Sequence, residues 1–383
     1  MSRKAAVIAA VVLAVLVVGG IFLSRSPLAR INFAGSLGSG GRANVRVPPG
    51  FTIEVFADGL EGPRFIAFGP DGVLHAAERG AGRIVALPDA DGDGRADAIR
   101  PLAADLDRPH SLAYHAGAWY VGVPSGVVRL VDEDGDGTAE ARTALIDDLP
   151  ADGVHTTRTV AFLPDGRMLV AVGSSCNVCV EDDPRRAAIL VYDDATGVNG
   201  RLFATGLRNA VGLAVEPDSS TLWAADNGRD LMGDDVPPEV LYLVTEGDHF
   251  GWPACHAGTI PDPEFGGPGA CDGVVQPVLT WQAHSAPLGL AFYGGDAFPD
   301  AYRGDLFIAL HGSWNRPQPV GYEVLRVPFD GGMPSGPAEV FATGWLSAGR
   351  VDGRPVGVAV GPDGALYVSD DRGGFVYRIA YGE

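Results

Sequence analysis

Arginine, histidine and asparagine recur just ahead of short apolar segments of the chain. The residues in these positions are Arg64, Arg108, His110, His155, Arg158, Arg208, Asn209, His284 and Arg354. A second polar set follows the second expected strand of each unit and comprises Glu78, Arg79, residues 174–179, Asp226, Asn227, Gly228, Arg229, residues 311–316, Asp370, Asp371 and Arg372. Guanidinium groups bind carboxylates through paired hydrogen bonds, so arginines gathered by the fold would suit an anionic or strongly polar ligand. The alternative is that each arginine caps strand carbonyls and pairs with an aspartate.

His155 is the residue in this group that could move a proton. It lies in Asp152-Gly-Val-His-Thr-Thr-Arg158, directly before an apolar segment. A neutral imidazole can accept a proton near pH 7, which makes His155 a candidate general base. A single histidine is more often structural, so the motif alone does not establish catalysis.

Six apolar triads with a central alanine divide the chain into similar units. They are Ile66-Ala67-Phe68, Leu112-Ala113-Tyr114, Val160-Ala161-Phe162, Leu213-Ala214-Val215, Leu290-Ala291-Phe292 and Val358-Ala359-Val360. Three triads lead into Pro-Asp-Gly turns, and several short strands follow in each unit. This pattern predicts an all-β fold, a six-bladed β-propeller, with a solenoid of the same strands as the alternative. The small alanine fits innermost strands that crowd around an axis.

The order of the strands predicts how the ring closes. Each unit ends in an outer strand, but the last unit stops after Tyr377-Arg-Ile-Ala380, and a matching segment, Phe51-Thr-Ile-Glu-Val-Phe56, precedes the first triad. We expect residues 51–56 to complete the last blade and remove its free edge. In such a ring both polar sets lie at one end of the axis, where they would form a positive mouth.

Composition excludes some classes of protein. The 383 residues carry a net charge of −20, which disfavours nucleic-acid binding. The 54 glycines and 29 prolines disfavour a mostly helical fold.

The N-terminus predicts export. Arg3 and Lys4 precede an apolar run over residues 5–23, which is about long enough to span a bilayer. We expect residues 1–23 to be a signal anchor, with a cleaved signal peptide as the alternative, and residues 24–44 to be a tether. The domain at 45–383 would then be periplasmic or otherwise extracytoplasmic, and anchored to the cytoplasmic membrane.

Four cysteines in an exported chain suggest two disulfides, although the spacing leaves the connectivity open. Cys255 and Cys271 fall in a long insertion at about residues 247–284, where a disulfide would order a loop with few apolar residues. Cys176 and Cys179 are read as a tight structural disulfide, because no second Cys-x-x-Cys is present to complete a zinc site.

Three further stretches carry a family resemblance. His155-Thr-Thr-Arg-Thr-Val-Ala-Phe, Gly206-Leu-Arg-Asn-Ala-Val-Gly-Leu-Ala214 and Gly247-Asp-His-Phe-Gly-Trp-Pro253 resemble soluble sugar dehydrogenases that use pyrroloquinoline quinone (PQQ), the glucose/aldose and sorbosone dehydrogenase group. The resemblance covers about residues 45–383. It implies an enzyme with PQQ and Ca²⁺ as cofactors that oxidises an aldose or a sugar aldehyde to a lactone or acid.

The resemblance also assigns roles to residues. His155 matches the base that takes the hydroxyl proton while hydride passes to the quinone, and Arg208 with Asn209 matches the pair beside the quinone oxygens. The turn of Asn227, Gly228 and Arg229 matches the segment whose carbonyls help to hold Ca²⁺. The cofactor carries three carboxylates, which suits Arg354 and the further candidates Arg64, His110 and Arg158. No lysine is available for the cofactor, which leaves His311 or Arg316 for that position.

The sequence departs from the glucose-oxidising pattern at Val154 and Ser174, where that pattern has acidic residues. The Cys176–Cys179 turn is closer to the sorbosone branch. These departures bear on the substrate more than on the cofactor.

Two acidic turns could bind structural Ca²⁺ away from the mouth. Their carboxylates are Asp89, Asp91 and Asp93 in the first turn and Asp132, Asp134 and Asp136 in the second. Alternating oxygen side chains with glycine resemble the start of a calcium loop, and plain solvated hairpins are the equal alternative.

Three functions remain open at this point. A quinoprotein would pass electrons to a membrane quinone or cytochrome c. A Ca²⁺-dependent propeller lactonase would need a buried carboxylate and asparagine cage at the axis. A non-catalytic binding propeller would not need a reactive histidine.

Overall fold

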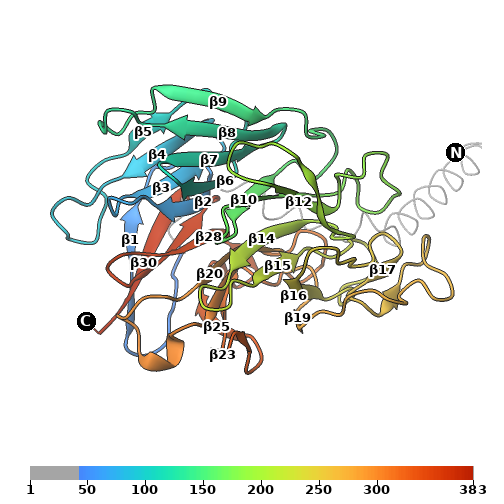
Figure 1. Cartoon of the computed structure of the whole chain (residues 1–383). Coiled ribbons are helices and arrows are strands. Elements are labelled where there is room, and N and C mark those ends of the chain that lie inside the picture. Colours follow the sequence, from blue (N-terminus) through green and yellow to red (C-terminus); the bar gives the residue numbers. More distant parts are fainter. Residues whose placement is uncertain (1–42, 383) are drawn as a thin grey trace, which may run out of the picture.

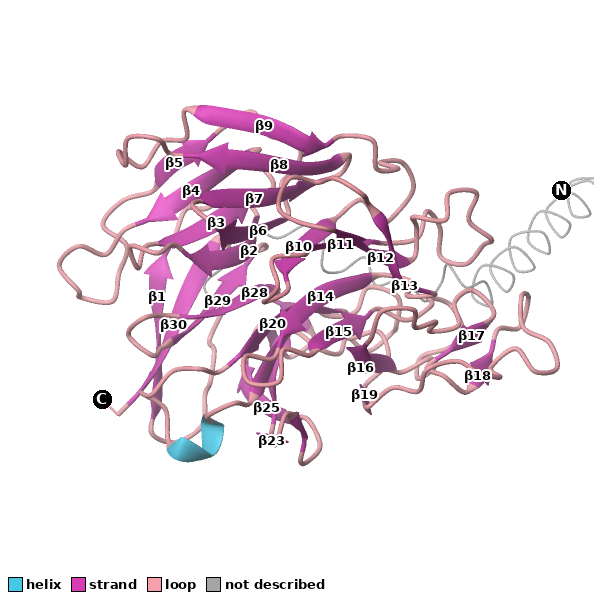
Figure 2. Ribbon diagram, in the orientation of Figure 1, coloured by secondary structure: helices cyan, strands magenta, loops and turns pink. Residues whose placement is uncertain are grey.

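The structure is a computed structural model and describes residues 43–382. It contains six four-stranded antiparallel sheets arranged as blades around an axis (Figure 1, Figure 2). The first blade contains β2 (Pro63–Phe68), β3 (Leu74–Glu78), β4 (Arg83–Leu87) and β5 (Arg100–Ala103). The second contains β6 (Ser111–His115), β7 (Ala118–Val123), β8 (Gly126–Val131) and β9 (Ala141–Ile146). The third contains β10 (Arg158–Phe162), β11 (Met168–Val172), β12 (Ala188–Tyr192) and β13 (Arg201–Thr205). The last three are β14 (Ala210–Val215), β15 (Leu222–Asp226), β16 (Glu239–Val244) and β19 (Leu279–Trp281); β20 (Pro287–Phe292), β21 (Leu306–Leu310), β22 (Glu323–Val327) and β25 (Glu339–Thr343); and β28 (Pro355–Val360), β29 (Leu366–Asp370), β30 (Phe375–Tyr381) and β1 (Phe51–Ala57). The predicted six-bladed propeller is confirmed.

Short elements complete the described chain. They are β17 (Cys255–His256), β18 (Ile260–Pro261), β23 (Phe329–Asp330), β24 (Met333–Pro334), β26 (Leu346–Ser347), β27 (Arg350–Val351) and the 3-10 turn η3 (Asp300–Tyr302). The expected anchor and nearly all of the tether lie outside residues 43–382. Within that range no helix has the length and apolar character needed to cross a membrane.

The N-terminal strand closes the ring, as predicted. β1 pairs antiparallel with β30, with Phe51 opposite Tyr381. The Phe51 ring packs edge-on against Phe298 and Phe341, at centroid distances of 4.7 and 5.1 Å. Residues from both ends of the chain therefore complete one blade, and the packing of Phe51 also fixes it to the preceding blade.

The inner strands approach most closely two residues before the alanine of each triad. Thr159 donates from Oγ1 to the Val211 carbonyl at 2.6 Å, which joins β10 to β14. In β20, Gly289 occupies the corresponding position, and a Cβ placed there would lie 2.5 Å from the Val356 carbonyl of β28. The crowding was expected at the alanines, which are half-buried. The closest contact lies instead two residues before the alanine, on the same face of the strand, because a backbone carbonyl of the neighbouring inner strand lies against that residue.

Both disulfides form as expected, Cys176–Cys179 and Cys255–Cys271. The second lies in the insertion, whose β17 and β18 stand to one side of the ring (Figure 2). Phe250, early in the insertion, packs against Tyr242 of β16 with ring centroids 4.4 Å apart. The insertion is thus attached to the outer part of the fourth blade.

Candidate functional site

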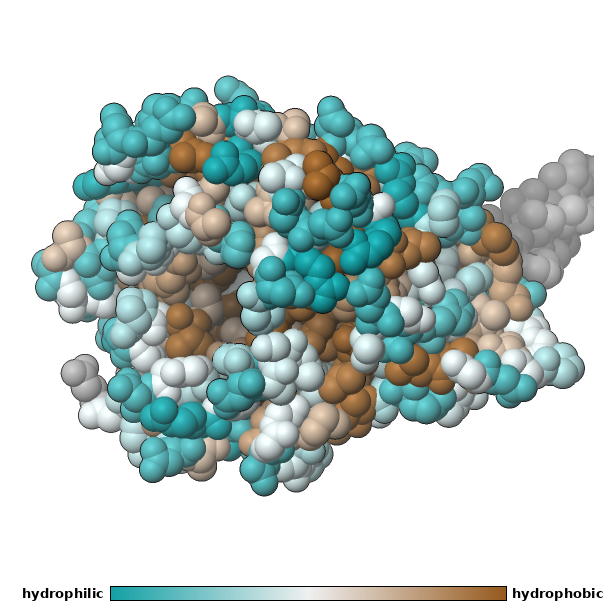
Figure 3. Space-filling view, viewed as in Figure 1, coloured by the Kyte–Doolittle hydropathy of each residue, from teal (hydrophilic) through white to brown (hydrophobic). Residues whose placement is uncertain are grey.

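We call the mouth the end of the ring at which the six inner strands begin. Each inner strand starts beside the end of its second strand, as Arg158 of β10 pairs with Val172 of β11 and Ala210 of β14 pairs with Asp226 of β15. The polar residues ahead of the inner strands and after the second strands therefore share this end, as predicted. Figure 3 has the view of Figure 1, in which η3 and β23 of the opposite end face the viewer, so the hollow with hydrophobic residues near its middle lies at the end away from the mouth.

His155 is half-buried and held through one ring nitrogen. Its Nδ1 lies 3.0 Å from the Ser174 carbonyl oxygen and 2.9 Å from Ser174 Oγ. Burial, followed by the positive charges of Arg208, Arg186 and Arg158, lowers the pKa of His155 to about 3, and the Ser174 carbonyl opposes this shift. The imidazole is therefore neutral near pH 7, which is the form a general base requires.

Arg208 lies at the same part of the mouth and is almost fully enclosed. Its guanidinium donates to the Asn177 carbonyl at 2.9 Å, to Asn177 Oδ1 at 2.9 Å, to Asp230 Oδ2 at 2.7 Å and to the Asn227 carbonyl at 3.2 Å. Gly173 allows Asn209 to lie beside His155, since a Cβ at that position would be 2.5 Å from Asn209 Oδ1 and 2.6 Å from His155 Cβ. His155, Arg208 and Asn209 therefore meet as the sequence indicated.

Two buried carboxyl groups support this part of the mouth from below. Asp226 accepts hydrogen bonds from the backbone amides of Arg208 and Asn209 at 3.1 and 2.7 Å. Glu239 accepts from the amides of Gly228 and Ala286 at 2.8 and 3.2 Å. Burial raises the pKa of each group to about 7. These groups brace the loops through backbone amides.

A second cluster at the mouth joins the fifth, sixth, first and second blades. Asp371 accepts from Arg64 Nη1 at 2.5 Å and lies 3.0 Å from His311 Nε2. Arg64 Nε donates to His110 Nδ1 at 3.2 Å. Arg354 donates to the carbonyl of His311 at 2.9 Å. Burial, together with the charge of Arg354, lowers the pKa of His311 to about 4.

This second cluster retains unused hydrogen-bond donors. His110 is fully buried, and its Nδ1 accepts from Arg64, so its Nε2 carries the proton. Within residues 43–382, His110 Nε2 and Arg79 Nε are buried without a hydrogen-bond partner. Buried unpaired donors are costly and call for a partner. Together with the charge of Arg64, these donors have the chemistry that suits a ligand with several carboxylates, but both nitrogens are closed to solvent and a carboxylate would reach them only after neighbouring side chains moved.

Other predicted side chains serve the protein itself. Arg158 is fully buried and donates to the carbonyls of His155, Thr157 and Pro150, which is the capping role given above as the alternative. Arg229 points into the insertion, where it pairs with Asp262 and with Glu264 at 2.6 Å. These arginines had been placed at the mouth because their strand positions put them there, but the loops turn their side chains away from it.

Two more predicted residues are held mainly by backbone contacts. Arg316 donates to the carbonyls of Gln318 and Asp234 at 3.0 and 2.5 Å. Asn227 donates to the carbonyls of Asn209 and Pro287 at 3.2 and 2.8 Å. These contacts do not use Asn227 Oδ1 or Arg316 Nη2, so the cofactor roles expected of both residues stay predictions. The carbonyls of Gly228 and Arg229 as calcium ligands stay a prediction.

Three residues at the mouth were given no individual role by the sequence, although Asn177 and Asn315 lie in the segments 174–179 and 311–316 of the second polar set. Asn177 and Asp230 hold Arg208, and Asn315 donates to Asp230 Oδ1 at 2.6 Å. They come from three different blades, which is why sequence spacing could not pair them. The local signals were the Cys-x-x-Cys turn, which contains Asn177, and the polar segment 311–316, which contains Asn315.

The acidic turns lie at the opposite end of the axis, each between a third and an outer strand. Carboxylate oxygens of Asp89, Asp91 and Asp97 lie within 4.8 Å of one another, as do those of Asp132, Asp134, Asp136 and Glu140. The first carboxylate of each turn accepts backbone amides of its own loop, such as Gly94 and Gly137. A role in binding calcium stays a prediction, and Asp93 is outside the first group.

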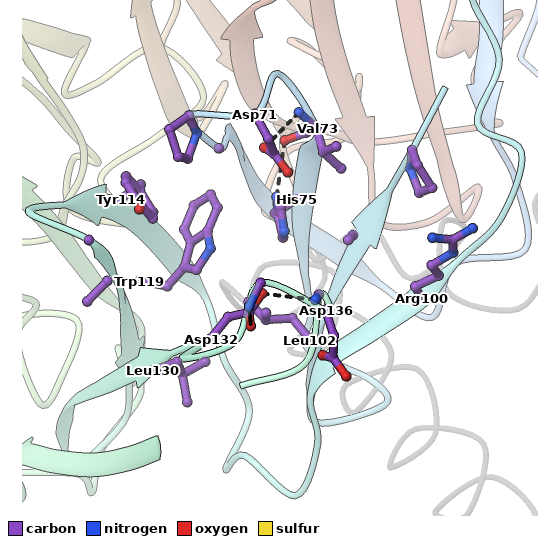
Figure 4. A pocket seen from close by; sticks show the side chains of 18 residues that line it. Asp71, Val73, His75, Arg100, Leu102, Tyr114, Trp119, Leu130, Asp132 and Asp136 are labelled. Carbon is purple, nitrogen blue, oxygen red and sulfur yellow. Dashed lines mark hydrogen bonds between the residues drawn. The ribbon is translucent and has the colours of Figure 1, made fainter. Parts of the chain in front are cut away.

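A pocket of about 440 Å³ lies between the first two blades, at the end away from the mouth (Figure 4). Trp119 and His75 form one wall, with ring centroids 4.4 Å apart, and Asp71, Asp132 and Asp136 also line it. His75 Nδ1 donates to the Val73 carbonyl at 3.1 Å. Trp119 is only 5% exposed and belongs to the core between the blades. Its ring therefore offers little surface to a ligand, and we place the candidate site at the mouth.

Comparison with known proteins places this geometry in a family. The chain is 28% identical to the pyrroloquinoline quinone-dependent pyranose dehydrogenase of Coprinopsis cinerea, over 88% of this chain and 55% of that protein. It is 26% identical to the pyrroloquinoline quinone-dependent sugar dehydrogenase of Hypocrea jecorina, over 86% of this chain and 88% of that protein. The chain thus spans about half of the Coprinopsis protein and most of the Hypocrea protein.

A solved structure is similar in both fold and sequence. The holo form of the pyranose dehydrogenase PQQ domain from Coprinopsis cinerea superposes with a TM-score of 0.76 at 25% identity, over 89% of this chain and 98% of that domain. The apo form of the soluble aldose sugar dehydrogenase from Escherichia coli gives 0.63 at 20% identity, over 86% of this chain and 99% of that chain, and supports the fold alone. The TrAA12-like family matches residues 45–263 and 267–382, and the chain belongs to that family.

Proposed function

We propose that this protein is a PQQ-dependent dehydrogenase that oxidises an aldose or a sugar aldehyde to a lactone or acid. The observation that carries the proposal is the pairing of a neutral His155, held through Nδ1, with an immobilised Arg208 at the mouth. The relatives named above use the same cofactor on sugars. Sorbosone and glucose remain separate candidates for the substrate.

His155 would take the proton from the substrate. Because Nδ1 faces two oxygen atoms of Ser174, the lone pair lies on Nε2, which is the atom that would accept the hydroxyl proton. PQQ, when bound, would supply the acceptor for the hydride that leaves the carbon bearing that hydroxyl. A sugar aldehyde carries such a hydroxyl as its hydrate, so water supplies the second oxygen of the acid. Arg208 would stabilise negative charge that develops nearby, through the N–H that its protein contacts leave unused.

The cofactor's carboxylates would be held by the second cluster. Arg64 and Arg354 supply charge, and His110 Nε2 and Arg79 Nε supply the buried donors that lack partners among the described residues. The donor set fits a tricarboxylate because charged hydrogen bonds would satisfy groups that are otherwise left unpaired. The proposal keeps His311 near the cofactor, and the carbonyls of Gly228 and Arg229 as calcium ligands.

The lactonase reading finds less support at the mouth. Its carboxylates are already engaged. Asp371 pairs with Arg64 and His311, Asp230 pairs with Arg208, and Asp226 and Glu239 accept from backbone amides. A lactonase would need such groups free to surround one ion. These pairings support the redox reading over the hydrolytic one.

Location and electron transfer belong to the same proposal. Arg46 pairs with Thr343 at the mouth end of β25, so the described chain begins on the mouth side of the fifth blade. We propose that an anchor at residues 5–23 holds this domain outside the cytoplasm through the tether at residues 24–44. Electrons would pass to a membrane quinone or cytochrome c.

Direct binding of PQQ tests the proposal. Apo-protein is titrated with PQQ in the presence of Ca²⁺, and binding is followed by equilibrium dialysis. Loss of a charged hydrogen bond costs about 1.5–3 kcal/mol, so Arg64→Met should weaken binding roughly tenfold or more. Arg167→Met removes a partly exposed arginine paired with Asp165 and Glu246, and this variant should bind PQQ normally. Failure of the wild-type protein to bind PQQ would remove the proposal.

A further inference from the structure

The segment at residues 174–179, which the Cys176–Cys179 disulfide closes, contacts His155 through Ser174 and Arg208 through Asn177. We propose that this turn is the positioning element of the site: Ser174 fixes which nitrogen of His155 carries the proton, and Asn177 holds the Arg208 guanidinium. The inference rests on the proposed function for its catalytic meaning. Its structural part can be tested on the cofactor-free protein.

The first half concerns the proton on His155. Ser174 Oγ donates to the Cys176 carbonyl at 2.6 Å, so its oxygen is left to accept. The Ser174 carbonyl can only accept, and both oxygens lie within 3.0 Å of His155 Nδ1. Nδ1 must therefore carry the proton, because a lone pair there would face two acceptors. The disulfide turn supplies the carbonyl that directs the serine hydroxyl.

The second half concerns Arg208. Asn177 accepts from Arg208 Nε with its carbonyl and from Nη2 with Oδ1, each at 2.9 Å. The same side chain accepts from the Asp230 amide at 2.8 Å and donates to the Asp230 carbonyl at 3.0 Å. With Asp230 Oδ2 and the Asn227 carbonyl, these contacts use four of the five guanidinium N–H groups. One N–H remains for a ligand, in a fixed orientation.

The groups that face His155 explain why a neutral partner suits this site. Arg208, Arg186 and Arg158 place positive charge around the ring, and Arg186 is itself paired with Asp152. Ser174 adds hydrogen-bond acceptors without adding a negative charge, so it orients the ring without favouring protonation. A carboxylate in its place would attract the second proton. The serine thus combines orientation with a base that stays unprotonated.

The state of His155 is measurable without PQQ. Nitrogen-15 NMR of apo-protein at pH 7 should show a neutral imidazole with the proton on Nδ1. Ser174→Asp should raise the pKa of His155 and move the acid limb of turnover to higher pH. A wild-type imidazole with its proton on Nε2 would overturn the first half of the proposal, whatever the activity.

The hold on Arg208 is tested with matched asparagine variants. Asn177→Ala removes the Oδ1 that accepts from Arg208 Nη2 and keeps the backbone carbonyl that accepts from Nε. It should speed hydrogen exchange at Arg208 Nη2 at least tenfold in apo-protein and lower turnover about tenfold in the reconstituted enzyme. Asn199→Ala alters an exposed turn between β12 and β13, where Asn199 bonds Asp193, and should change neither readout. Circular dichroism confirms that both variants fold.

The outcomes separate the two proposals. Unchanged exchange at Arg208 in folded Asn177→Ala would overturn the positioning role. Faster exchange in a protein that never oxidises sugars with PQQ would support the hold on Arg208 and overturn the proposed function. Faster hydrogen exchange at Arg208 in an Asn177→Ala enzyme that keeps full turnover would overturn the role of the turn in catalysis.

Discussion

The acid limb of the pH–rate profile is the sharpest consequence of the surroundings of His155. Burial and the neighbouring arginines lower its pKa to about 3, compared with about 6.5 for an ordinary histidine. A lowered pKa keeps the base neutral as the pH falls. At pH 5 a group with a pKa near 3 is about 99% neutral, whereas an ordinary histidine is only about 3% neutral, a difference of roughly 30-fold in active base.

The assay is turnover of the PQQ-loaded protein between pH 4 and pH 8, with an electron-accepting dye that is insensitive to pH. We expect nearly constant turnover down to pH 5. The His155→Gln variant should bind PQQ normally and lose about 10²- to 10⁴-fold in turnover, the usual contribution of a general base. A fall in turnover with a midpoint between pH 6 and 7 that the His155→Gln variant does not show would refute the proposed lowering of the His155 pKa by its surroundings.

Three further predictions concern stability. Gly289→Ala should destabilise the fold by about 1–3 kcal/mol in denaturant unfolding, since its Cβ would meet the Val356 carbonyl, whereas Gly294→Ala has open space and should not. Deleting residues 43–57 should lower Tm and promote aggregation measured by light scattering, because it exposes the edge of β30; a monomeric deletion with unchanged Tm would contradict ring closure by β1. Burial raises the pKa of Asp370 to about 6, so its contribution to stability is present at low pH and is lost as the pH rises through 6. Asp370→Asn keeps the Oδ1 that accepts from three backbone amides and replaces Oδ2, which has no hydrogen-bond partner. Its free energy of unfolding at pH 8 should exceed that of the wild-type protein by up to about 3 kcal/mol, and this difference should disappear near pH 4.

The propeller was predictable because its signals are local and repeated. The alanine triads mark the inner strands, and the segment at 51–56 carries the outer-strand pattern that the last unit lacks. The insertion disulfide was likewise indicated by Cys255 and Cys271 in one long interval. Each of these inferences uses residues that are near one another in sequence or that recur in every blade.

The direction of individual side chains was not predictable. Arg158 and Arg229 occupy the expected strand ends, but one caps backbone carbonyls and the other turns toward Asp262 in the insertion. The hold on Arg208 depends on Asn177 and Asp230, which lie in different blades and meet only after folding. Which donor faces the axis is decided by loop conformations that no repeat determines.

The close approach of the inner strands was missed for a similar reason. The repeated alanine was visible, but the contact between Gly289 and the Val356 carbonyl involves two neighbouring blades. A glycine at that position, and Thr159 at the equivalent position of β10, are distinct residues that solve the same packing constraint. Sequence similarity between the blades therefore understates how alike their contacts are.

The central claim is that the mouth, loaded with PQQ and Ca²⁺, oxidises sugars with His155 as the base. The direct measurement is the absorption spectrum of bound PQQ under anaerobic conditions after excess aldose or sugar aldehyde is added. We predict rapid reduction of the bound cofactor in the wild-type protein and slow reduction in His155→Gln at equal occupancy. An unchanged spectrum of the loaded wild-type protein across a broad panel of sugars would contradict the claim.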